Sequence, residues 1–469
     1  MGRKHRNSQK AARTKPGDLE LTPALTRANS PNPITAEPTG APQVAPAAKK
    51  PSGFANLLLH LHPRMVNEET LQLNRTFGLG GMALLLFFVL IGTGALLLFV
   101  YEPNADRAYT SVTALSDDVP FGAFVRAVHH WAGNGLLIVS FLHLLRVFYT
   151  GAFLPPRRFN WILGLILLAI VMAGNFTGYL LPWDQLSYWA VTIGTGMLQY
   201  VPLAGDPLMQ LARGGAEVGP KTLSLFFVVH IALLPIVLFL LMSFHFWKVR
   251  KAGGVMLPAS EGKRPTMVPV QPNLTVREGV AALVLLAVLL PVSAVFQAPL
   301  EEQANAGLSP NPAKAPWYFM GVQEMLIHLH PTFAVLVLPL LGLAFLFGFP
   351  FLKYDPSHSG LWFHSRQGRS YAVRSAIAAG ILVPLAVVLD EFVLRWSKIL
   401  PGLPPEVSTG LIPLLLWTLI FCGILFLLVR RASRIEAVQA AFTFATAGLL
   451  ALTLIGVFFR GQSMRLVWP

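Results

Sequence analysis

The stretch VHHWAGNGLLIVSFLHLLR, from Val128 to Arg146, decides the fold class of this 469-residue chain. It is long and apolar enough to cross a bilayer, yet it contains His129, His130 and His143. Ionisable side chains are costly inside a membrane and are kept there when they have a function. The stretch therefore predicts a membrane helix that carries a binding site.

The composition of the whole chain also indicates a membrane protein. Hydrophobic residues make up 54% of the chain and charged residues only 12%, about half the charged fraction of a soluble protein. We predict an all-α, polytopic transmembrane helical bundle of about nine spans. The predicted spans cover residues 77–101, 124–149, 159–181, 223–247, 277–297, 333–352, 371–394, 409–430 and 436–459.

The formal net charge of +14 reflects membrane orientation and not nucleic-acid binding. Lys and Arg gather in the N-terminal tail and in short loops, such as those with Arg157, Arg158 and Arg430. These loops share one side of the membrane if the N-terminus is cytoplasmic. We predict a disordered, basic cytoplasmic tail over residues 1–55. The single cysteine, Cys422, excludes a disulfide framework and a Cys-ligated iron–sulfur cluster within the chain.

Four intramembrane histidines form two matched pairs. His129 and His143 are 14 residues apart, and His230 and His245 are 15 apart, which separates each pair by about 21–22 Å on one broad helix face. The two helices run in the same direction, so His129 should lie opposite His230 and His143 opposite His245. Two imidazoles across a gap suit a planar macrocycle with a central iron, whereas zinc needs about four ligands. A lone histidine that bonds to a neighbouring helix is the alternative, and matched pairs argue against it.

Four glycines repeat the same interval on the first and third spans. These are Gly80 and Gly94 on the first span, and Gly164 and Gly178 on the third. Glycine allows a flat group to approach the backbone closely, so we expect these residues to line the haem sites. Ordinary small-residue packing is the alternative, and Gly81 and Gly92 would serve it equally well.

Two arginines flank the first histidine pair. Arg126 lies one turn before His129, and Arg146 follows His143 by three residues. They would pair with haem propionates or extend to the membrane interface, and the two roles are compatible. His130 lies about 100° around the helix from His129, so we assign it to helix packing or to a propionate contact.

Three motifs carry a family resemblance: VRAVHHW…FLHLLR, GYLLPWDQLSYWAVTIGTG and TLSLFFVVH…SFHFWKVRKAGG. They closely resemble the short, plastid-type cytochrome b6 of quinol–cytochrome c or plastocyanin reductase complexes. The resemblance implies an N-terminal di-haem domain at 56–255 with a four-helix haem-binding bundle. A subunit-IV-like domain with the quinol-site loop follows at 256–352. Residues 353–469 add transmembrane helices that carry no motif.

The resemblance also implies a function. The chain would bind two non-covalent b-type haems and serve as the membrane di-haem subunit of a quinol–cytochrome c, or similar, oxidoreductase. One quinol electron would pass to a Rieske iron–sulfur protein or a cytochrome c subunit, and the other would cross the membrane through both haems. Proton uptake inside and release outside would complete a Q-cycle. The implied setting is a homodimeric complex in an energy-transducing membrane, such as the bacterial inner membrane.

The chain departs from this family in two motifs. The family's Pro-Glu-Trp-Tyr becomes Ala315, Pro316, Trp317 and Tyr318, so the proton-accepting carboxylate is missing. Glu324 lies seven residues beyond Trp317, about two helical turns on. We therefore expect Trp317, Tyr318 and Glu324 to form the quinol site. His328 or His330 would assist Glu324, and the alternative is that Glu324 only caps or pairs at the interface.

The second departure concerns an additional haem. Gly78 stands where the plastid form has the cysteine that fixes this haem, so we expect no covalent haem.

Two other functional classes remain for comparison. A di-haem membrane anchor that passes electrons between quinone and a peripheral redox subunit would also use paired histidines, but it needs neither PWDQ nor APWYF. The missing glutamate would suit such an atypical partner. A transporter with intramembrane polar sites would give the four histidines no role.

Overall fold

The computed structural model describes residues 64–258, 265–355 and 359–468, and the predicted tail at 1–55 lies outside these ranges. Within them, nine helices are long and apolar enough to cross a membrane, which confirms the predicted all-α transmembrane bundle. These spans are Leu79–Leu97, Gly122–Tyr149, Arg158–Leu180, Pro220–Lys251, Val270–Val295, Thr332–Phe351, Arg366–Phe392, Glu406–Val429 and Arg434–Phe458. The predicted boundaries differ from these by a few residues at most ends.

The spans comprise the following elements: α3 (Leu79–Leu97), α5 (Gly122–Tyr149), α6 (Arg158–Leu180), α9 (Pro220–Val228), η3 (Val229–Leu233), α10 (Leu234–Lys251), α11 (Val270–Val295), η5 (Thr332–Val337), α13 (Leu338–Gly348), η6 (Phe349–Phe351), α14 (Arg366–Phe392), η7 (Glu406–Leu411), α16 (Ile412–Val429) and α17 (Arg434–Phe458). Shorter elements connect them: η1 (Glu68–Leu71), α2 (Leu73–Thr76), α4 (Ala108–Asp117), α7 (Gln185–Gly196), η2 (Met197–Tyr200), α8 (Gly205–Arg213), η4 (Trp317–Phe319), α12 (Met320–His328), α15 (Trp396–Ile399) and η8 (Gln462–Met464). One antiparallel ladder joins β1 (Met65–Asn67) to β2 (Met267–Pro269).

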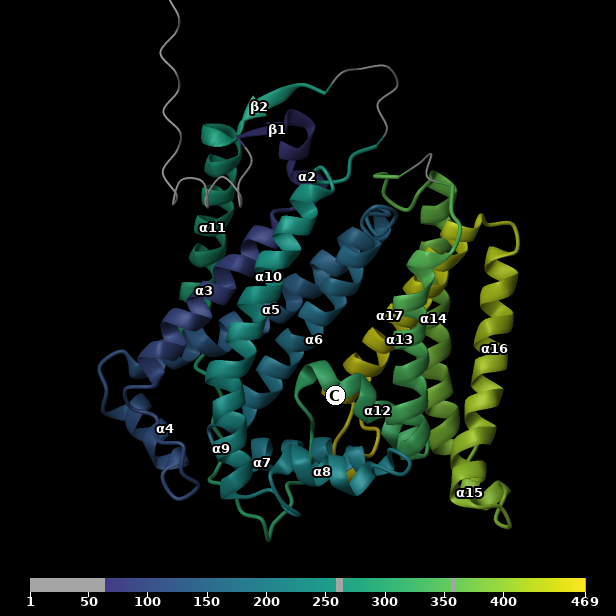
Figure 1. Cartoon of the computed structure of the whole chain (residues 1–469). Helices are drawn as coiled ribbons and strands as arrows, with labels where there is room; N and C mark the ends of the chain where they lie inside the picture. Colours follow the sequence, from purple (N-terminus) through teal and green to yellow (C-terminus); the bar gives the residue numbers. More distant parts are fainter. Residues whose placement is uncertain (1–63, 259–264, 356–358, 469) are drawn as a thin grey trace, which may run out of the picture. The chain divides into compact units, whose positions relative to one another are not determined.

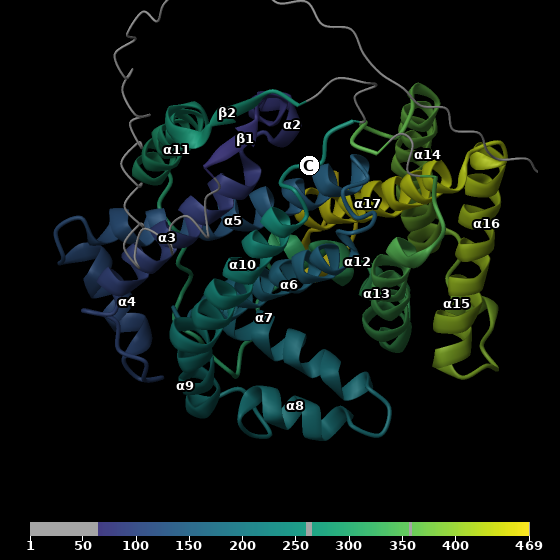
Figure 2. The same ribbon diagram turned by 45° about the horizontal axis from the view of Figure 1, so that its top comes forward.

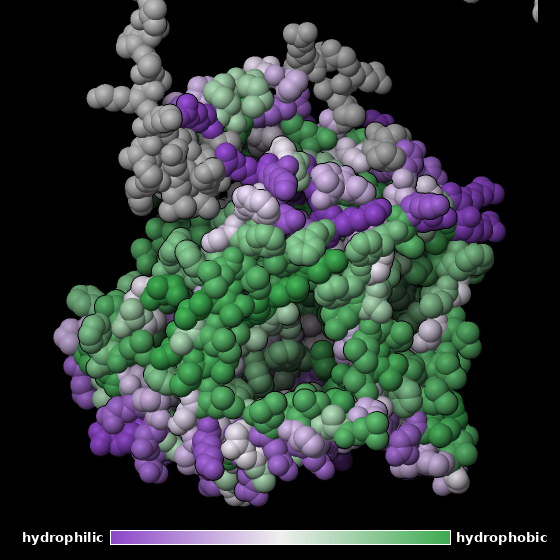
Figure 3. All heavy atoms as spheres, viewed as in Figure 1, coloured by the Kyte–Doolittle hydropathy of each residue, from purple (hydrophilic) through white to green (hydrophobic). Residues whose placement is uncertain are grey.

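The spans form two neighbouring groups. Helix α5 contacts α3 and α6, and α6 contacts α10, while α14 contacts α16 and α17; both groups can be followed in Figures 1 and 2. Figure 3 shows an apolar belt between two polar bands, as expected for a protein surrounded by lipid.

A buried aromatic cluster joins the two groups near the C-terminal end of α5. Phe148 lies 4.0 Å from Phe442 of α17 and 5.2 Å from Phe349 of η6, measured between ring centroids. Gln439 of α17 donates from Nε2 to the carbonyl of Tyr149 at 3.2 Å. The C-terminal helices are therefore tied directly to α5, which carries the first histidine pair.

In the described residues, three π-helical turns belong to the spans: η3 interrupts one span, and η5 and η7 begin two others. Each ends two residues before a proline, namely Pro235, Pro339 and Pro413. Proline has no N–H for the carbonyl four residues earlier, so the helix widens to accommodate it. The Thr409 carbonyl, four residues before Pro413, instead accepts from the His330 N–H at 2.9 Å. Within η3, the same distortion lies at His230.

Two glycines allow α12 to lie close against α17. An added Cβ at Gly321 would come within 2.7 Å of Leu449 Cδ1 and 3.0 Å of the Leu449 carbonyl oxygen, and one at Gly456 within 3.2 Å of the Met320 carbonyl. The short helix is therefore fixed by backbone approach to a span from the other end of the chain.

Gly321→Ala should destabilise the protein by about 1–3 kcal/mol, because the added methyl group overpacks the α12–α17 contact. The midpoint of thermal unfolding in detergent measures the effect. Gly423→Ala is the matched control, because a Cβ there meets nothing within 4 Å and alanine favours a helix. Equal midpoints for the two variants would contradict the predicted overpacking.

Candidate functional site

The structure brings the four predicted histidines together in two facing pairs. The ring centroids of His129 and His230 are 6.2 Å apart, and those of His143 and His245 are 6.4 Å apart. The first residue of each pair lies on α5, and the second on η3 or α10. The pairing expected from the 14- and 15-residue intervals is the pairing observed.

Hydrogen bonds orient the rings of the first pair. His129 Nδ1 lies 2.9 Å from Thr93 Oγ1 on α3, and His230 Nδ1 lies 3.1 Å from the Gly174 carbonyl on α6. Thr177 Oγ1 is a further partner of His230 Nδ1 at 3.2 Å. Engagement of Nδ1 leaves Nε2 as the free nitrogen, which is the usual arrangement of a metal-binding imidazole. In the second pair, His245 Nδ1 is buried and has no hydrogen-bond partner in the described part of the chain.

Each of the four predicted glycines faces one of these histidines. An added Cβ would lie 2.6 Å from His230 at Gly178 and 3.2 Å from His129 at Gly94. At Gly80 and Gly164 it would lie 3.8 Å from His143 and His245, respectively. The comparison glycines, Gly81 and Gly92, meet nothing within 4 Å. The glycines with the histidine interval therefore leave room for the histidine rings, whereas the two comparison glycines have no such neighbour.

The two rings of each pair, with centroids 6.2 or 6.4 Å apart, could each offer one nitrogen to an iron held between them. Within the described residues, no group of three or more His, Cys, Asp or Glu side chains could hold a bare metal ion. The donor set of two imidazoles across a gap thus fits a haem iron, whose macrocycle supplies the remaining ligands.

The two flanking arginines bond to protein carbonyls. Arg126 donates from Nη2 to the Ala298 carbonyl at 2.6 Å, and Arg146 donates from Nε to the Arg75 carbonyl at 2.7 Å. Arg146 is buried within electrostatic reach of Arg75 and Arg157. Nε of Arg75 and Nε of Arg157 are themselves buried without a described partner. Positive groups gathered in this way favour an anion, and a haem propionate would supply one.

His130 belongs to a chain of polar contacts that links α5 to the APWYF segment. Its Nε2 lies 3.2 Å from Asn134 Nδ2, and Asn134 Oδ1 accepts from Trp317 Nε1 at 2.7 Å. We expected His130 to serve packing or a propionate. The hydrogen bonds support the packing role, because they connect His130 through Asn134 to Trp317, the predicted quinol-site tryptophan.

The predicted quinol-site residues occupy distinct environments. Trp317 is exposed, whereas the Tyr318 hydroxyl is buried without a described partner, and burial raises the pKa of Tyr318. Glu324 is fully buried and forms an ion pair with Arg460. His330 lies 6.0 Å from Tyr200 between ring centroids, and its Nδ1 is buried without a described partner.

Arg460 and Asp390 were not among the predicted site residues. Arg460 pairs with Glu324, and Asp390 lies 2.7 Å from the Nδ1 atom of His328. The sequence indicates both residues only weakly: each is a charged residue at the border of an apolar span, Asp390 near the end of one and Arg460 just after another. Their partners lie 62 and 136 residues away along the chain, so sequence spacing gave no reason to connect them.

An apolar pocket of about 390 Å³ adjoins the first histidine pair. It is lined by Phe176, Thr177, Gly194, Thr195, Leu198, Ala212, Leu225, Phe226 and Val229. Thr177 also bonds to His230, and Phe176 contacts Phe319 of η4 at 5.7 Å between ring centroids. The pocket therefore lies between a histidine pair and the APWYF segment.

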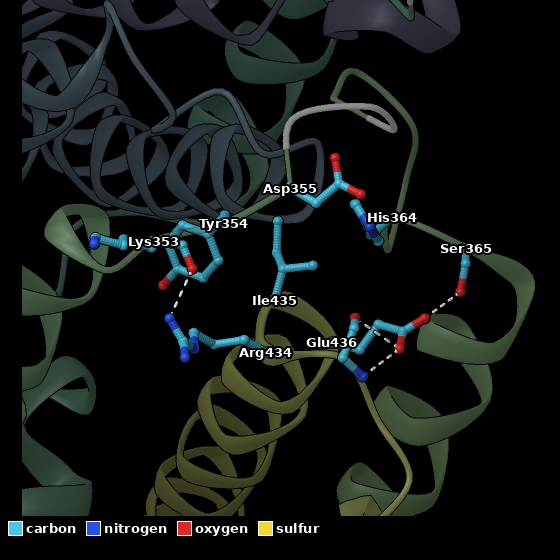
Figure 4. Close-up of a pocket in the computed structure, with 9 residues that line it drawn as sticks. Lys353, Tyr354, Asp355, His364, Ser365, Arg434, Ile435 and Glu436 are labelled. Carbon is cyan, nitrogen blue, oxygen red and sulfur yellow. Dashed lines mark hydrogen bonds between the residues drawn. The ribbon is translucent and has the colours of Figure 1, made fainter. Parts of the chain in front are cut away.

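A second, polar pocket of about 590 Å³ lies beside the start of α17 (Figure 4). It is lined by Lys353, Tyr354, Asp355, His364, Ser365, Ser433, Arg434, Ile435 and Glu436. Glu436 accepts hydrogen bonds from Ser365 and Ser433, and Arg434 donates to the Lys353 carbonyl at 3.0 Å. These bonds connect the segments that precede α14 to α17.

The fold and the paired imidazoles define a membrane haem protein of the cytochrome b class. A model of the cytochrome b/b6 family matches residues 66–253. Cytochrome b6 of Heliomicrobium gestii is 44% identical over 181 residues, which cover 39% of this chain and 85% of that protein. Cytochrome b6 of Prochlorococcus marinus (strain MIT 9303) is 40% identical over 182 residues, covering 39% of this chain and 84% of that protein.

The chain belongs to the cytochrome b/b6 family. It is an integral membrane cytochrome b of a quinol oxidoreductase complex, with b-type haem as its class of cofactor. A solved structure described as a hyperthermophilic respiratory Complex III shares the fold, with a TM-score of 0.64 and 24% identity. The match covers 84% of this chain and 98% of that one. The likeness in fold therefore extends well beyond residues 66–253.

Gly178→Ala should lower the haem content of the purified protein, because the new methyl group would displace the His230 ring. The ratio of b-type haem to polypeptide measures the effect. Gly164→Ala should lower this ratio less, since its Cβ lies 3.8 Å from His245 and not 2.6 Å from a ring. Gly81→Ala is the control without a neighbour, and full haem content in Gly178→Ala would contradict the assignment.

Proposed function

We propose that this chain is a di-haem cytochrome b that carries electrons across the membrane between a quinol-oxidising and a quinone-reducing site. The observation that supports this most directly is the presence of two facing imidazole pairs, 6.2 and 6.4 Å between centroids. The pairs are separated by about 21–22 Å along α5 and α10. His129 and His230 would hold one haem, and His143 and His245 the other.

A bound b-type haem would accept and donate single electrons at each pair. The protein residues orient the ligands, through Thr93 and the Gly174 carbonyl, and keep water away from the electron path. The core between the levels of the two pairs is apolar, with Leu86, Leu136 and Val171 buried. Gly80, Gly94, Gly164 and Gly178 would provide clearance, and Arg126 and Arg146 would stabilise propionates.

We assign quinol oxidation to the apolar pocket beside His230. Its volume of about 390 Å³ lies within the range of small-molecule sites, about 300–1,000 Å³. Thr177 belongs both to the pocket wall and to the hydrogen bonding of His230. Trp317 and Tyr318 would close the site from η4, and Glu324 would receive a quinol proton in place of the carboxylate that Pro316 cannot supply.

The remaining assignments follow from the family resemblance. Residues 56–255 would form the di-haem domain, 256–352 the subunit-IV-like domain and 353–469 the additional helices. A Rieske protein or a cytochrome c subunit would take the first quinol electron in a Q-cycle. The complex would be a homodimer in a bacterial inner membrane with the N-terminus cytoplasmic, which puts the pair His129 and His230 on the non-cytoplasmic side.

A di-haem anchor for a peripheral redox subunit is the second candidate. The observation that favours it is Pro316, because the chain lacks the usual quinol-site carboxylate. The partner found in the purified complex distinguishes the two functions.

Reduction of the purified complex by a quinol analogue should reveal two b-type components in a redox titration, with two haems per polypeptide. The reduced-minus-oxidised spectrum and a haem assay provide the measurements. A single component would refute the di-haem assignment, and no reduction by quinol would refute the quinol-oxidising function.

Glu324→Gln should slow quinol oxidation by about 10²-fold or more, as expected for loss of a proton-transfer group, with both haem spectra retained. The rate of quinol-dependent haem reduction measures this loss. Glu436→Gln makes the same chemical change at a buried carboxylate of α17 that lies among the polar-pocket residues. It should leave the rate unchanged. Wild-type turnover in Glu324→Gln would remove Glu324 from the reaction.

A further inference from the structure

Five charged or titratable groups meet where α12, α14 and the segment after α17 converge. They are Glu324, His328, Asp390, Glu391 and Arg460. The side chains of Glu324 and Arg460 are 0% exposed, those of His328 and Asp390 are 12% exposed, and that of Glu391 is 20% exposed. All five lie outside the family-matched residues 66–253.

Arg460 forms the fixed centre of this cluster. Its Nε donates to both Glu324 carboxylate oxygens, at 3.1 and 3.0 Å, and its Nη1 donates to Glu391 Oε2 at 2.5 Å. Nη1 also donates to the Met464 carbonyl at 2.9 Å. A buried guanidinium held by four acceptors keeps its charge and its position, so it is the frame of the cluster and not a carrier of protons.

His328 has a partner for every protonation state of its ring. Nδ1 lies 2.7 Å from Asp390 Oδ2, while Nε2 lies 3.3 Å from Glu324 Oε1 and 3.0 Å from Arg460 Nη2. With the proton on Nδ1, the ring donates to Asp390 and accepts from Arg460. With the proton on Nε2, it donates to Glu324, and the imidazolium donates to both carboxylates. Each N–H of the ring therefore has a carboxylate acceptor. Arg460 Nη2, which can only donate, loses Nε2 as an acceptor when Nε2 is protonated but keeps its bond to Glu324.

The charge balance keeps a proton on this ring. Three carboxylates face one guanidinium, so the cluster has room for a second positive charge. Burial lowers the pKa of His328, and the hydrogen bonds to Asp390 and Glu324 raise it. The increase exceeds the decrease, so the net pKa lies above its ordinary value. Burial raises the pKa of Glu324, but the bonds from His328 and Arg460 lower it to a net value below the ordinary one. A proton that reaches Glu324 therefore moves on to His328.

The cluster begins close to the proposed quinol pocket and ends nearer the surface. Phe319 contacts Phe176 of the pocket wall, and Glu324 follows five residues later, about 7–8 Å along the helix. His328 lies one turn further on. Asp390 lies two residues before the end of α14 and also accepts from Trp396 Nε1 at 2.5 Å. Exposure rises in the same order, from 0% at Glu324 to 12% at His328 and Asp390.

We propose that His328 and Asp390 form a proton-release relay, built by the C-terminal helices, that conducts quinol protons from Glu324 to the outer surface. The relay rests on the proposed quinol-oxidising function. Among the described residues, the charged groups that face His328 are Glu324 from α12, Asp390 from α14 and Arg460 from the segment after α17.

The relay moves protons and no electrons. Oxidation of one quinol releases two protons and two electrons. The relay takes a proton at His328 Nε2 and gives one from Nδ1 to the Asp390 carboxylate, whose acid form loses it to water. The neutral ring is then protonated on Nε2. Exchange with water, in which Nε2 loses one proton and Nδ1 gains one, restores the first tautomer, for which Asp390 and Arg460 are again the partners.

The test compares three variants of the purified complex by the pH dependence of quinol-driven haem reduction. Wild-type rate should rise with pH as His328 loses its proton, with a midpoint above the ordinary histidine value of about 6.5. His328→Gln should lose this pH-dependent limb and slow by about 10²-fold or more. Asp390→Asn removes the anion at Nδ1 and should move the midpoint about one unit or more toward acid.

Glu391→Gln is the matched control, because Glu391 contacts Arg460 and not His328. It removes no hydrogen bond to the His328 ring, so it should move the midpoint less than Asp390→Asn does, and haem content verifies assembly of each variant. If His328→Gln does not assemble, the midpoint shift in Asp390→Asn decides the question. If the rate of His328→Gln still rises with pH as in the wild type, the relay is wrong. Equal midpoints in Asp390→Asn and Glu391→Gln would also overturn the relay, and neither result would affect the proposed function. Wild-type complex that quinol does not reduce would overturn the proposed function itself.

Discussion

The approach of two imidazoles from α5 and α10 to a separation near 6.3 Å is the constraint on which the N-terminal half depends. Under the proposed function, a flat haem would supply the remaining ligands and would need clearance on its open sides. Glycines on α3 and α6 lie against the histidine rings and would provide it. The interval of 14 or 15 residues repeats the arrangement at a second depth in the same bundle.

Prolines determine how several spans deviate from regular α-helix. Pro235 produces the π turn at His230, and Pro413 frees the Thr409 carbonyl that the His330 N–H then occupies. At Pro413 the missing proline N–H leaves a carbonyl that the His330 N–H occupies, and at Pro235 the helix widens around His230. The distortions therefore lie at histidine-bearing segments or at their contacts.

The C-terminal helices supply contacts that their lack of motifs does not suggest. Phe442 and Gln439 of α17 reach the end of α5, and Arg460 reaches Glu324 on α12. The short helix that begins at the APWYF segment is therefore fixed from the far end of the chain. This arrangement accounts for a buried carboxylate on α12, because a buried charge requires a partner that remains in place.

The sequence by itself determined the membrane class, the nine spans and the four histidines, because apolar length and helical period are local properties that neighbours do not alter. It also connected Gly80, Gly94, Gly164 and Gly178 with the histidines by their shared spacing, and each of these glycines lies against a histidine ring. Only the tertiary structure decided the surroundings of Glu324 and His328. Their partners Arg460 and Asp390 come from other helices, and no periodicity within one helix records which side chains of distant helices will meet.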